Sequence, residues 1–196
     1  MVQLLNEHQH IYLLDGVFSD MECEYIRKVI DKYSINEEKY GHQSNVQGNT
    51  IAVIEIPYEK TRERVTGILQ KITKDIFSKY NFGKSKVSSM ECPLLRKING
   101  ATRLHMDGLL IEALMDMENK TLHMDRFREM SMIAAINDDY DGGEICFPDQ
   151  NFEIKLKKGQ VLLFPPYWTH PHRTNKPKNG TFRYTITTWL TIDHGL

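Results

Sequence analysis

The sequence predicts a mainly β fold, a jelly roll with two flanking helices. Between residues 132 and 191, six short β-runs follow one another, separated at short intervals by turn residues in DDYDGG, PDQN, KKGQ and NKPKNG. Such spacing favours an all-β sandwich or barrel over alternating βαβ units. Both helical patterns lie in the N-terminal part of the chain, so we expect the helices to pack outside the β-core.

The composition limits the domain organisation and the classes of function. A chain of 196 residues, 40 % apolar and 26 % charged, suits one soluble domain with a well-buried core. A net charge of −1 without a basic run argues against a nucleic-acid partner, and no apolar run reaches the length of a membrane span. The N-terminus lacks a signal-peptide pattern, and three widely spaced cysteines favour a reducing compartment. We therefore expect one cytoplasmic domain over 1–196, with strands and support helices in 1–85 and the jelly-roll core in 86–196.

The N-terminal part is expected to supply the two packing helices and some strands. Residues 9–15 predict a short strand, and a capping box at Ser19 opens a helix with one apolar face. Residues 51–57 predict another strand, and residues 59–80 carry the apolar spacing of the second helix. The intervening residues 35–50 are polar and without periodicity, which indicates a long loop of the kind that is often functional.

The middle of the chain alternates strands with one insertion. Residues 86–98 predict a strand that Pro93 interrupts, and residues 102–107 predict the next one after the turn at Asn99-Gly100. Residues 108–130 then leave the β-pattern, with leucines spaced for a short amphipathic helix. This insertion is either a lid over a site or a surface excursion that packs its leucines onto the sheet.

The six later runs complete the predicted core. We expect strands at residues 132–137, 144–147, 152–156, 160–164, 169–174 and 182–191. Polar and charged residues that could bind a metal or a ligand lie on the predicted strand at 102–107 and on the last two runs: His105, Asp107, His170, His172 and Arg183. The sequence therefore predicts a functional site on a β-scaffold.

The strand at 102–107 ends in a histidine and an aspartate that can act together. Side chains two apart on a strand point to the same side, so His105 and Asp107 present an imidazole and a carboxylate to one point. His123 and Asp125 repeat this spacing inside the insertion, without the turn and β-run that precede the first copy. We therefore favour His105 and Asp107 as metal ligands.

A third ligand has to come from a strand that is not adjacent in sequence. Only His170 and His172 lie on one, and both face the same way. Their spacing does not choose between them, and either one can instead be a satisfied core residue. Two histidines and one carboxylate with open coordination positions are the ligand set of non-haem Fe(II) oxygenases. The residues therefore predict an iron enzyme.

Arg183 stands between two aromatic residues in the last β-run. A charged group inside an apolar strand is costly unless it is paired. The planar guanidinium presents a fork that suits a carboxylate. That carboxylate can belong to a ligand or to an internal Asp or Glu.

Taken together, the motifs resemble a known family. In chain order they are His105-x-Asp107, NDDYDGGE at 137–144, Lys158-Gly159, Phe164-Pro165, Pro171-His172-Arg173, Gly180-x-x-Arg183-Tyr184 and Trp189. This order is similar to that of the 2-oxoglutarate- and Fe(II)-dependent oxygenases, within them the prolyl 4-hydroxylase-like branch with its small viral and bacterial forms. The opening VFSDMECEYIRKVI is similar to the first helix of that branch, so the resemblance spans nearly the whole chain.

The resemblance implies a cupin-like double-stranded β-helix and a role for each site residue. His105, Asp107 and His172 would bind Fe(II), and His172 is chosen over His170 because PHR ahead of the glycine turn matches the branch. Arg183 would hold the distal carboxylate of 2-oxoglutarate. O2 would be the oxidant and ascorbate an optional reductant, and no further side chain is assigned a catalytic role.

The implied activity is hydroxylation of an unactivated C–H bond, coupled to oxidative decarboxylation of 2-oxoglutarate. The substrate would be a prolyl or other peptide residue in a peptide or protein, or else a small molecule. The alternatives are a cupin-like metal enzyme or isomerase without 2-oxoglutarate, and a non-catalytic jelly-roll binding module; neither needs a buried Arg183. Where the branch carries an aromatic residue ahead of H-x-D, this chain has Arg96-Lys97-Ile98. Contacts to the second carboxylate of 2-oxoglutarate are therefore left unassigned.

Overall fold

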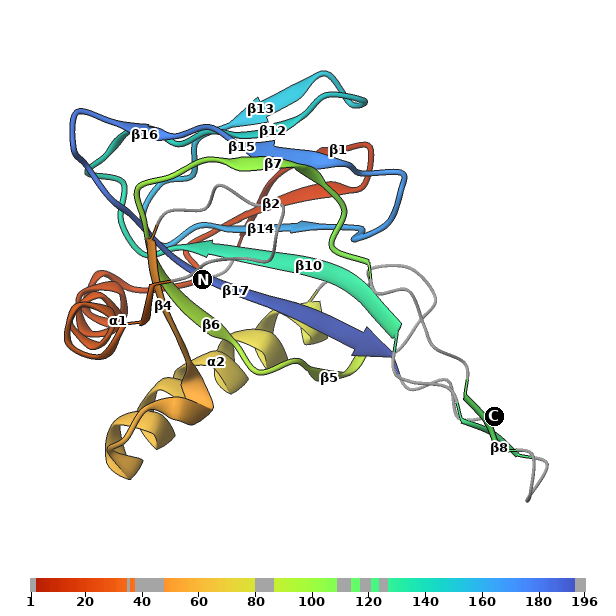
Figure 1. Ribbon diagram of the computed structural model, residues 1–196, viewed down its shortest axis with the longest axis horizontal. Helices are drawn as coiled ribbons and strands as arrows, with labels where there is room; N and C mark the ends of the chain where they lie inside the picture. The colour runs from red at the N-terminus through yellow and green to blue at the C-terminus, as the bar shows by residue number, and fades with distance from the viewer. Residues whose placement is uncertain are drawn as a thin grey trace.

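Two antiparallel sheets face each other across the middle of the molecule (Figure 1). The structure, a computed structural model, describes residues 3–34, 36–37, 48–79, 87–108, 114–116, 121–123 and 127–192. Within these residues strands predominate and two α-helices are present. The predicted fold class, mainly β with two N-terminal helices, is confirmed.

The larger sheet has the strand order β1-β2-β14-β10-β17-β6-β4-β3, and β5 also pairs with β17. Its strands are β1 (Gln3–His8), β2 (Ile11–Asp15), β3 (Asn36–Glu37), β4 (Gly48–Ala52), β5 (Val87–Met90), β6 (Leu94–Ile98), β10 (Phe127–Ala135), β14 (Val161–Phe164) and β17 (Arg183–Ile192). The break between β5 and β6 falls at Pro93, as predicted, because proline has no N–H to give to the ladder. The two longest strands, β10 and β17, lie side by side at its centre.

The smaller sheet has the order β13-β12-β15-β7. Its strands are β7 (Thr102–His105), β12 (Ile145–Phe147), β13 (Phe152–Ile154) and β15 (His172–Thr174). Two short pairs complete the described strands: β11 (Asp141–Gly142) with β16 (Pro177–Lys178), and β8 (Leu114–Asp116) with β9 (Thr121–His123). In β7 and β15, His105 lies directly opposite His172, so the register of the smaller sheet already brings two predicted ligands together.

The side chains of β10 and β17 alternate between the helices and the space between the sheets. Met132 and Ala134 belong to the apolar cluster that contains the helices, whereas Ile133 and Ala135 belong to the cluster between the sheets. Directly opposed residues of an antiparallel pair share a face, and Ala135 is opposed by Thr185. One row of β17 therefore faces the interior between the sheets: Arg183, Thr185, Thr187 and Trp189.

Both helices pack on the outer face of the larger sheet (Figure 1). The helix α1 (Asp20–Tyr33) begins at the predicted capping box, in which the Glu22 amide donates to Ser19 Oγ at 3.3 Å and the Ser19 amide donates to Glu22 Oε2 at 2.8 Å. The second helix, α2, spans Glu59–Lys79. Their apolar faces bury the residues that the sequence spacing indicates: Cys23, Ile26, Val29, Ile30, Val65, Leu69, Ile72 and Ile76.

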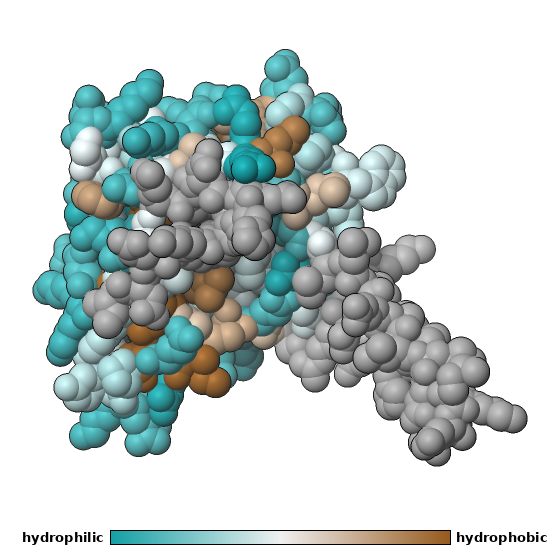
Figure 2. All heavy atoms as spheres, in the orientation of Figure 1, coloured by the Kyte–Doolittle hydropathy of each residue, from teal (hydrophilic) through white to brown (hydrophobic). Residues whose placement is uncertain are grey.

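Apolar side chains are concentrated in the two clusters rather than on the surface. Figure 2 shows that the described surface on this side is mainly hydrophilic, with separate hydrophobic patches. Among the described helices, none is both long and apolar enough to cross a membrane.

Three local predictions are wrong. The strand predicted at 169–174 begins only at His172, so His170 lies in the turn before it and does not share a strand face with His172. The strand predicted at 51–57 stops at Ala52, and a 3-10 turn follows at Val53–Glu55 because the Glu55 carboxylate accepts the Ala52 amide at 3.1 Å. The helix predicted inside 108–130 is contradicted at Leu114–Asp116, which pairs with β9 and so satisfies its backbone in a strand ladder. The rest of the predicted helix, and both candidate lids, fall largely outside the described residues.

Candidate metal centre

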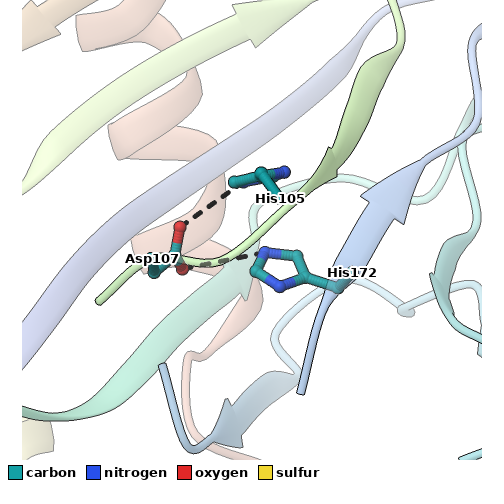
Figure 3. A group of neighbouring side chains, drawn as sticks. All are labelled: His105, Asp107 and His172. Atoms are coloured by element: carbon teal, nitrogen blue, oxygen red, sulfur yellow. Dashed lines mark ion pairs between the residues drawn. The ribbon is translucent and has the colours of Figure 1, made fainter. Parts of the chain in front are cut away.

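Three of the predicted ligands meet at one end of the smaller sheet (Figure 3). His105 ends β7, His172 begins β15, and Asp107 follows two residues after His105. One ligand atom from each lies within 4.8 Å of the others. His105 Nε2 is 3.4 Å from Asp107 Oδ1, and His172 Nε2 is 3.7 Å from Asp107 Oδ2.

Backbone carbonyls orient both imidazoles. His105 Nδ1 lies 2.8 Å from the Arg103 carbonyl oxygen, and His172 Nδ1 lies 3.2 Å from that of His170. Because a carbonyl can only accept, Nδ1 is the donor in each ring, and the lone pair of the neutral ring is on Nε2. Metal-binding histidines are usually arranged in this way: one ring nitrogen binds the metal, and the other donates a hydrogen bond to the protein.

The charges of the three side chains are coupled. Burial alone would raise the pKa of Asp107, but hydrogen bonds from His105 and Ser131 and the charge of His172 hold it well below its ordinary value of 3.8. Burial lowers the pKa of His172 to about 4. For His105, partial desolvation would lower the pKa, yet the hydrogen bonds to Asp107 and the Arg103 carbonyl raise it above 6.5. At neutral pH the group therefore offers a carboxylate and the neutral imidazole of His172, while His105 holds a proton more firmly than a free imidazole does.

This donor set fits a divalent first-row metal. Imidazole nitrogen and carboxylate oxygen are ligands that suit iron, and a set of two histidines and one carboxylate leaves coordination positions open. The His172 and Asp107 side chains are 3 % and 10 % exposed, whereas that of His105 is 41 % exposed. The arrangement therefore has one sheltered side and one side open to solvent.

We expect metal affinity to fall with decreasing pH through a single proton. A protonated imidazole cannot ligate, and the pKa of His105 lies above 6.5 while that of His172 is about 4. Below the His105 pKa, one proton must leave for each metal bound, so affinity should drop about tenfold per pH unit towards pH 5. Above that pKa, affinity should level off. Dissociation constants for Co(II), measured from pH 5 to 8.5, check this. A dependence of log affinity on pH that is twice as steep would mean that two protons are released, and it would contradict the prediction.

His170 is not part of the cluster. It is buried, its Nε2 lies 2.8 Å from the Gln9 carbonyl oxygen and its Nδ1 lies 2.9 Å from Thr169 Oγ1. Both ring nitrogens thus have protein partners, and this histidine ties the turn between β1 and β2 to the loop before β15. The His123 side chain and Asp125 lie outside the described residues.

Arg183 is buried at the start of β17 and faces the interior between the sheets. It is 5 % exposed, and its Nη1 donates a long hydrogen bond of 3.4 Å to the Gly143 carbonyl. Among the described residues, its Nε has no hydrogen-bond partner and no carboxylate forms an ion pair with it. Burial, together with the charge of Arg96, lowers the pKa of Arg183 to about 10 although Tyr140 opposes this. The internal salt bridge that the sequence left open is therefore not seen in the described structure.

Sequence reasoning missed two neighbours of Arg183. Thr185 lies two residues further on the same face, is buried, and its Oγ1 has no hydrogen-bond partner within the described ranges. Arg96 lies opposite Thr185 in β6, so it shares that face, and its charge acts on both Arg183 and His105. Thr185 could have been found from the sequence, because it lies two residues after Arg183 and residues two apart on a strand share a face. The position of Arg96 depends on strand register, which local sequence does not give.

Comparison with known proteins assigns one segment of the chain to a family. Residues 99–191 match the model of the 2OG-Fe(II) oxygenase superfamily. This segment belongs to that superfamily. The match contains His105, Asp107, His172 and Arg183. The resemblance seen in the sequence, and with it the iron and 2-oxoglutarate that give the superfamily its name, is confirmed.

The relatives of this 2OG-Fe(II) oxygenase domain include prolyl hydroxylases. Mouse prolyl 3-hydroxylase 1 is 22 % identical over 221 residues, which cover 97 % of this chain and 29 % of that protein. The chain thus spans 29 % of the length of such curated relatives.

Solved structures show the same fold. The viral collagen prolyl hydroxylase of Paramecium bursaria Chlorella virus-1, as a 2OG complex, is 19 % identical with a TM-score of 0.69 over 94 % of this chain and 97 % of that one. A Trichoplax adhaerens prolyl hydroxylase, in complex with a hypoxia-inducible-factor peptide fragment, is 13 % identical with a TM-score of 0.67, over 93 % and 84 %. The predicted double-stranded β-helix is therefore confirmed.

Proposed function

We propose that this protein is an Fe(II)- and 2-oxoglutarate-dependent dioxygenase that hydroxylates an unactivated C–H bond in a prolyl or other peptide residue. The observation that carries the proposal is Arg183, a buried cation whose Nε finds no partner in the part of the chain that the structure describes. It shares the interior between the sheets with a cluster of two histidines and a carboxylate. We also propose that residues 1–196 act as one domain, since the helices share a core with β10 and β17.

His105, Asp107 and His172 would hold the iron. Their oxygen and nitrogen atoms converge from β7 and β15, and the Nδ1 hydrogen bonds fix the rings so that each Nε2 is available. When bound, iron and 2-oxoglutarate supply the chemistry that activates O2, and the protein supplies orientation and electrostatics. Asp107 also supplies the negative charge that offsets part of the charge of the metal.

Arg183 and Thr185 would hold the distal carboxylate of 2-oxoglutarate. A guanidinium can give that carboxylate two parallel hydrogen bonds, and the Thr185 hydroxyl can add a third. In a buried site these bonds are needed, because an unpaired charge and an unpaired hydroxyl are both costly. Arg96, on the same face of the sheet, adds a second positive charge to this interior. A dicarboxylate therefore suits the pocket better than a neutral ligand.

Aromatic side chains close the sheltered side of the metal centre. The Phe164 ring lies edge-on to the His172 ring at 4.7 Å between centroids, and the Phe147 ring lies at 5.6 Å. Both phenylalanines are fully buried. They keep water from this side of His172, so access to the metal is left to the side of His105.

The open side near His105 is where we place the substrate. The His105 side chain is 41 % exposed, so a substrate can approach the metal from this side. A peptide carrying a prolyl residue fits this setting, and the relatives that are prolyl hydroxylases support it. A cupin-like enzyme without 2-oxoglutarate, or a binding module, would leave Arg183 without a role.

Turnover of 2-oxoglutarate tests the proposal. We expect the Fe(II)-loaded protein to release succinate from 2-oxoglutarate in O2, and peptides that contain proline to increase the rate and gain one oxygen atom each. Stimulation by small molecules but not by peptides would move the substrate to that class. A metal-loaded protein that shows no turnover of 2-oxoglutarate with any of these substrates would contradict the proposed activity.

A further inference from the structure

Two residues of β10 donate hydrogen bonds to Asp107. Ser131 Oγ donates to Asp107 Oδ2 at 2.7 Å, and Arg128 Nη1 donates to the Asp107 main-chain carbonyl at 2.6 Å. Ser131 is fully buried, and it lies opposite Trp189 on the interior face. The carboxylate and its backbone are therefore each fixed by a separate hydrogen bond from the same strand.

A β-bulge lets both residues face Asp107. Residues three apart on a regular strand point to opposite faces. The register between β10 and β17 shifts between Arg128 and Met130, so that Arg128 is opposed by Thr191 and Ser131 by Trp189. Both partners are odd-numbered residues of β17 and share its interior face. Bulges often re-aim a side chain next to an active site, and this one turns Arg128 inwards.

Arg128 is itself held rigidly. Its Nε and Nη2 donate to the two carboxylate oxygens of Glu91 at 2.5 and 2.6 Å, and its guanidinium stacks on the Trp189 ring at 3.7 Å from the centroid. The Tyr167 hydroxyl donates to the Arg128 carbonyl. With its position determined on several sides, the guanidinium can fix the direction in which the chain leaves β7.

We propose that Ser131 and Arg128 are positioning residues for Asp107 and determine how firmly the metal is held. The proposal rests on the metal site of the proposed function. Ser131 occupies one lone pair of Oδ2 and so sets the rotation of the carboxylate, whereas Arg128 sets the position of its backbone. Neither residue belongs to the candidate ligand cluster. Partners of this kind typically contribute about 10- to 100-fold to metal affinity.

Binding of Co(II) alone, followed by its visible absorption, tests the proposal without turnover. For Ser131→Ala we expect affinity about 10- to 100-fold weaker and an altered Co(II) spectrum, with a melting temperature in EDTA close to that of the wild type. Ser131→Thr keeps the hydroxyl and should restore both. Arg128→Lys keeps the charge but loses the fork, so it should also weaken binding.

Thr73→Ala is the matched control, because it removes a hydroxyl that donates to the Leu69 carbonyl at 2.8 Å in α2, away from the metal site. Its Co(II) affinity and spectrum should be those of the wild type. If folded Ser131→Ala binds Co(II) with wild-type affinity and spectrum, the role of Ser131 is overturned. The same result for Arg128→Lys would overturn the role of Arg128. If Ser131→Ala does not fold, Arg128→Lys decides. Failure of the wild type to bind Co(II) would overturn the metal site itself, whereas binding that is lost in Asp107→Ala but kept in both variants would overturn the positioning role alone.

Discussion

Asp107→Ala is expected to abolish metal binding while the protein stays folded. Asp107 lies between the two imidazoles and is the carboxylate of the cluster. Its loss removes a ligand and the negative charge that favours a cation, so the effect should exceed the roughly 10- to 100-fold of an outer-shell change. His172→Ala should act in the same way. Titration with Fe(II) without O2, or with Co(II), measures the loss, and a melting curve in EDTA checks the fold.

Two controls separate this site from its alternatives. His170→Ala should keep metal binding and lose some stability, because its ring nitrogens contact Gln9 and Thr169 rather than the cluster. Asp125→Ala, in the second H-x-D copy, should also keep it. Loss of the metal in His170→Ala with retention in His172→Ala would mean that the third ligand is wrongly assigned. Loss in Asp125→Ala with retention in Asp107→Ala would move the site to the insertion.

Arg183→Ala should weaken 2-oxoglutarate binding by about 30-fold to several thousand-fold. Removing one partner of a desolvated, charge-assisted contact costs about 2–5 kcal/mol, and each 1.4 kcal/mol is tenfold in affinity. Metal affinity should change little, because Arg183 is not in the ligand cluster. The melting temperature without ligand should stay the same or rise, since a buried guanidinium that pairs with no carboxylate of the described residues destabilises the folded state.

Arg173→Ala provides the matched control for this experiment. Arg173 lies on β15 beside His172, but its side chain is exposed and donates to Asn175. Its removal should leave 2-oxoglutarate affinity unchanged, whereas Arg183→Lys should keep part of it through the retained charge. Calorimetric titration of the metal-loaded variants gives the affinities. Unchanged affinity in Arg183→Ala, or its failure to fold, would make Arg183 a structural residue.

Local signals predicted the helices and most of the strands. The capping box at Ser19 and the apolar spacing of α1 act within one turn of helix, so the sequence alone indicates them. The hairpin of β1 and β2 was missed in part because its turn has left-handed residues, Gln9 and His10 with φ of 47° and 66°, that are not glycine. The Gln9 carbonyl accepts from His170, 161 residues away in the sequence. Such a tertiary contact leaves no local pattern.

Some features of the site were likewise predictable from local sequence, whereas others depend on how distant strands pair. The alternation of a strand predicted that His105 and Asp107 act together, and the cost of a buried charge pointed to Arg183. The register that sets His172 opposite His105, and the bulge that turns Arg128 towards Asp107, depend on pairing between distant strands. Residue spacing alone left His170 and His172 equal, and it gave no sign of Arg128 or Ser131.

Anaerobic addition of 2-oxoglutarate to the Fe(II)-loaded protein tests the central claim most directly. If the metal cluster and Arg183 serve one co-substrate, a metal-to-ligand charge-transfer band should appear in the visible and saturate with 2-oxoglutarate. The band should be absent in Asp107→Ala and should require far more 2-oxoglutarate in Arg183→Ala. A wild-type protein that binds Fe(II) but gives no band at saturating 2-oxoglutarate would contradict the account.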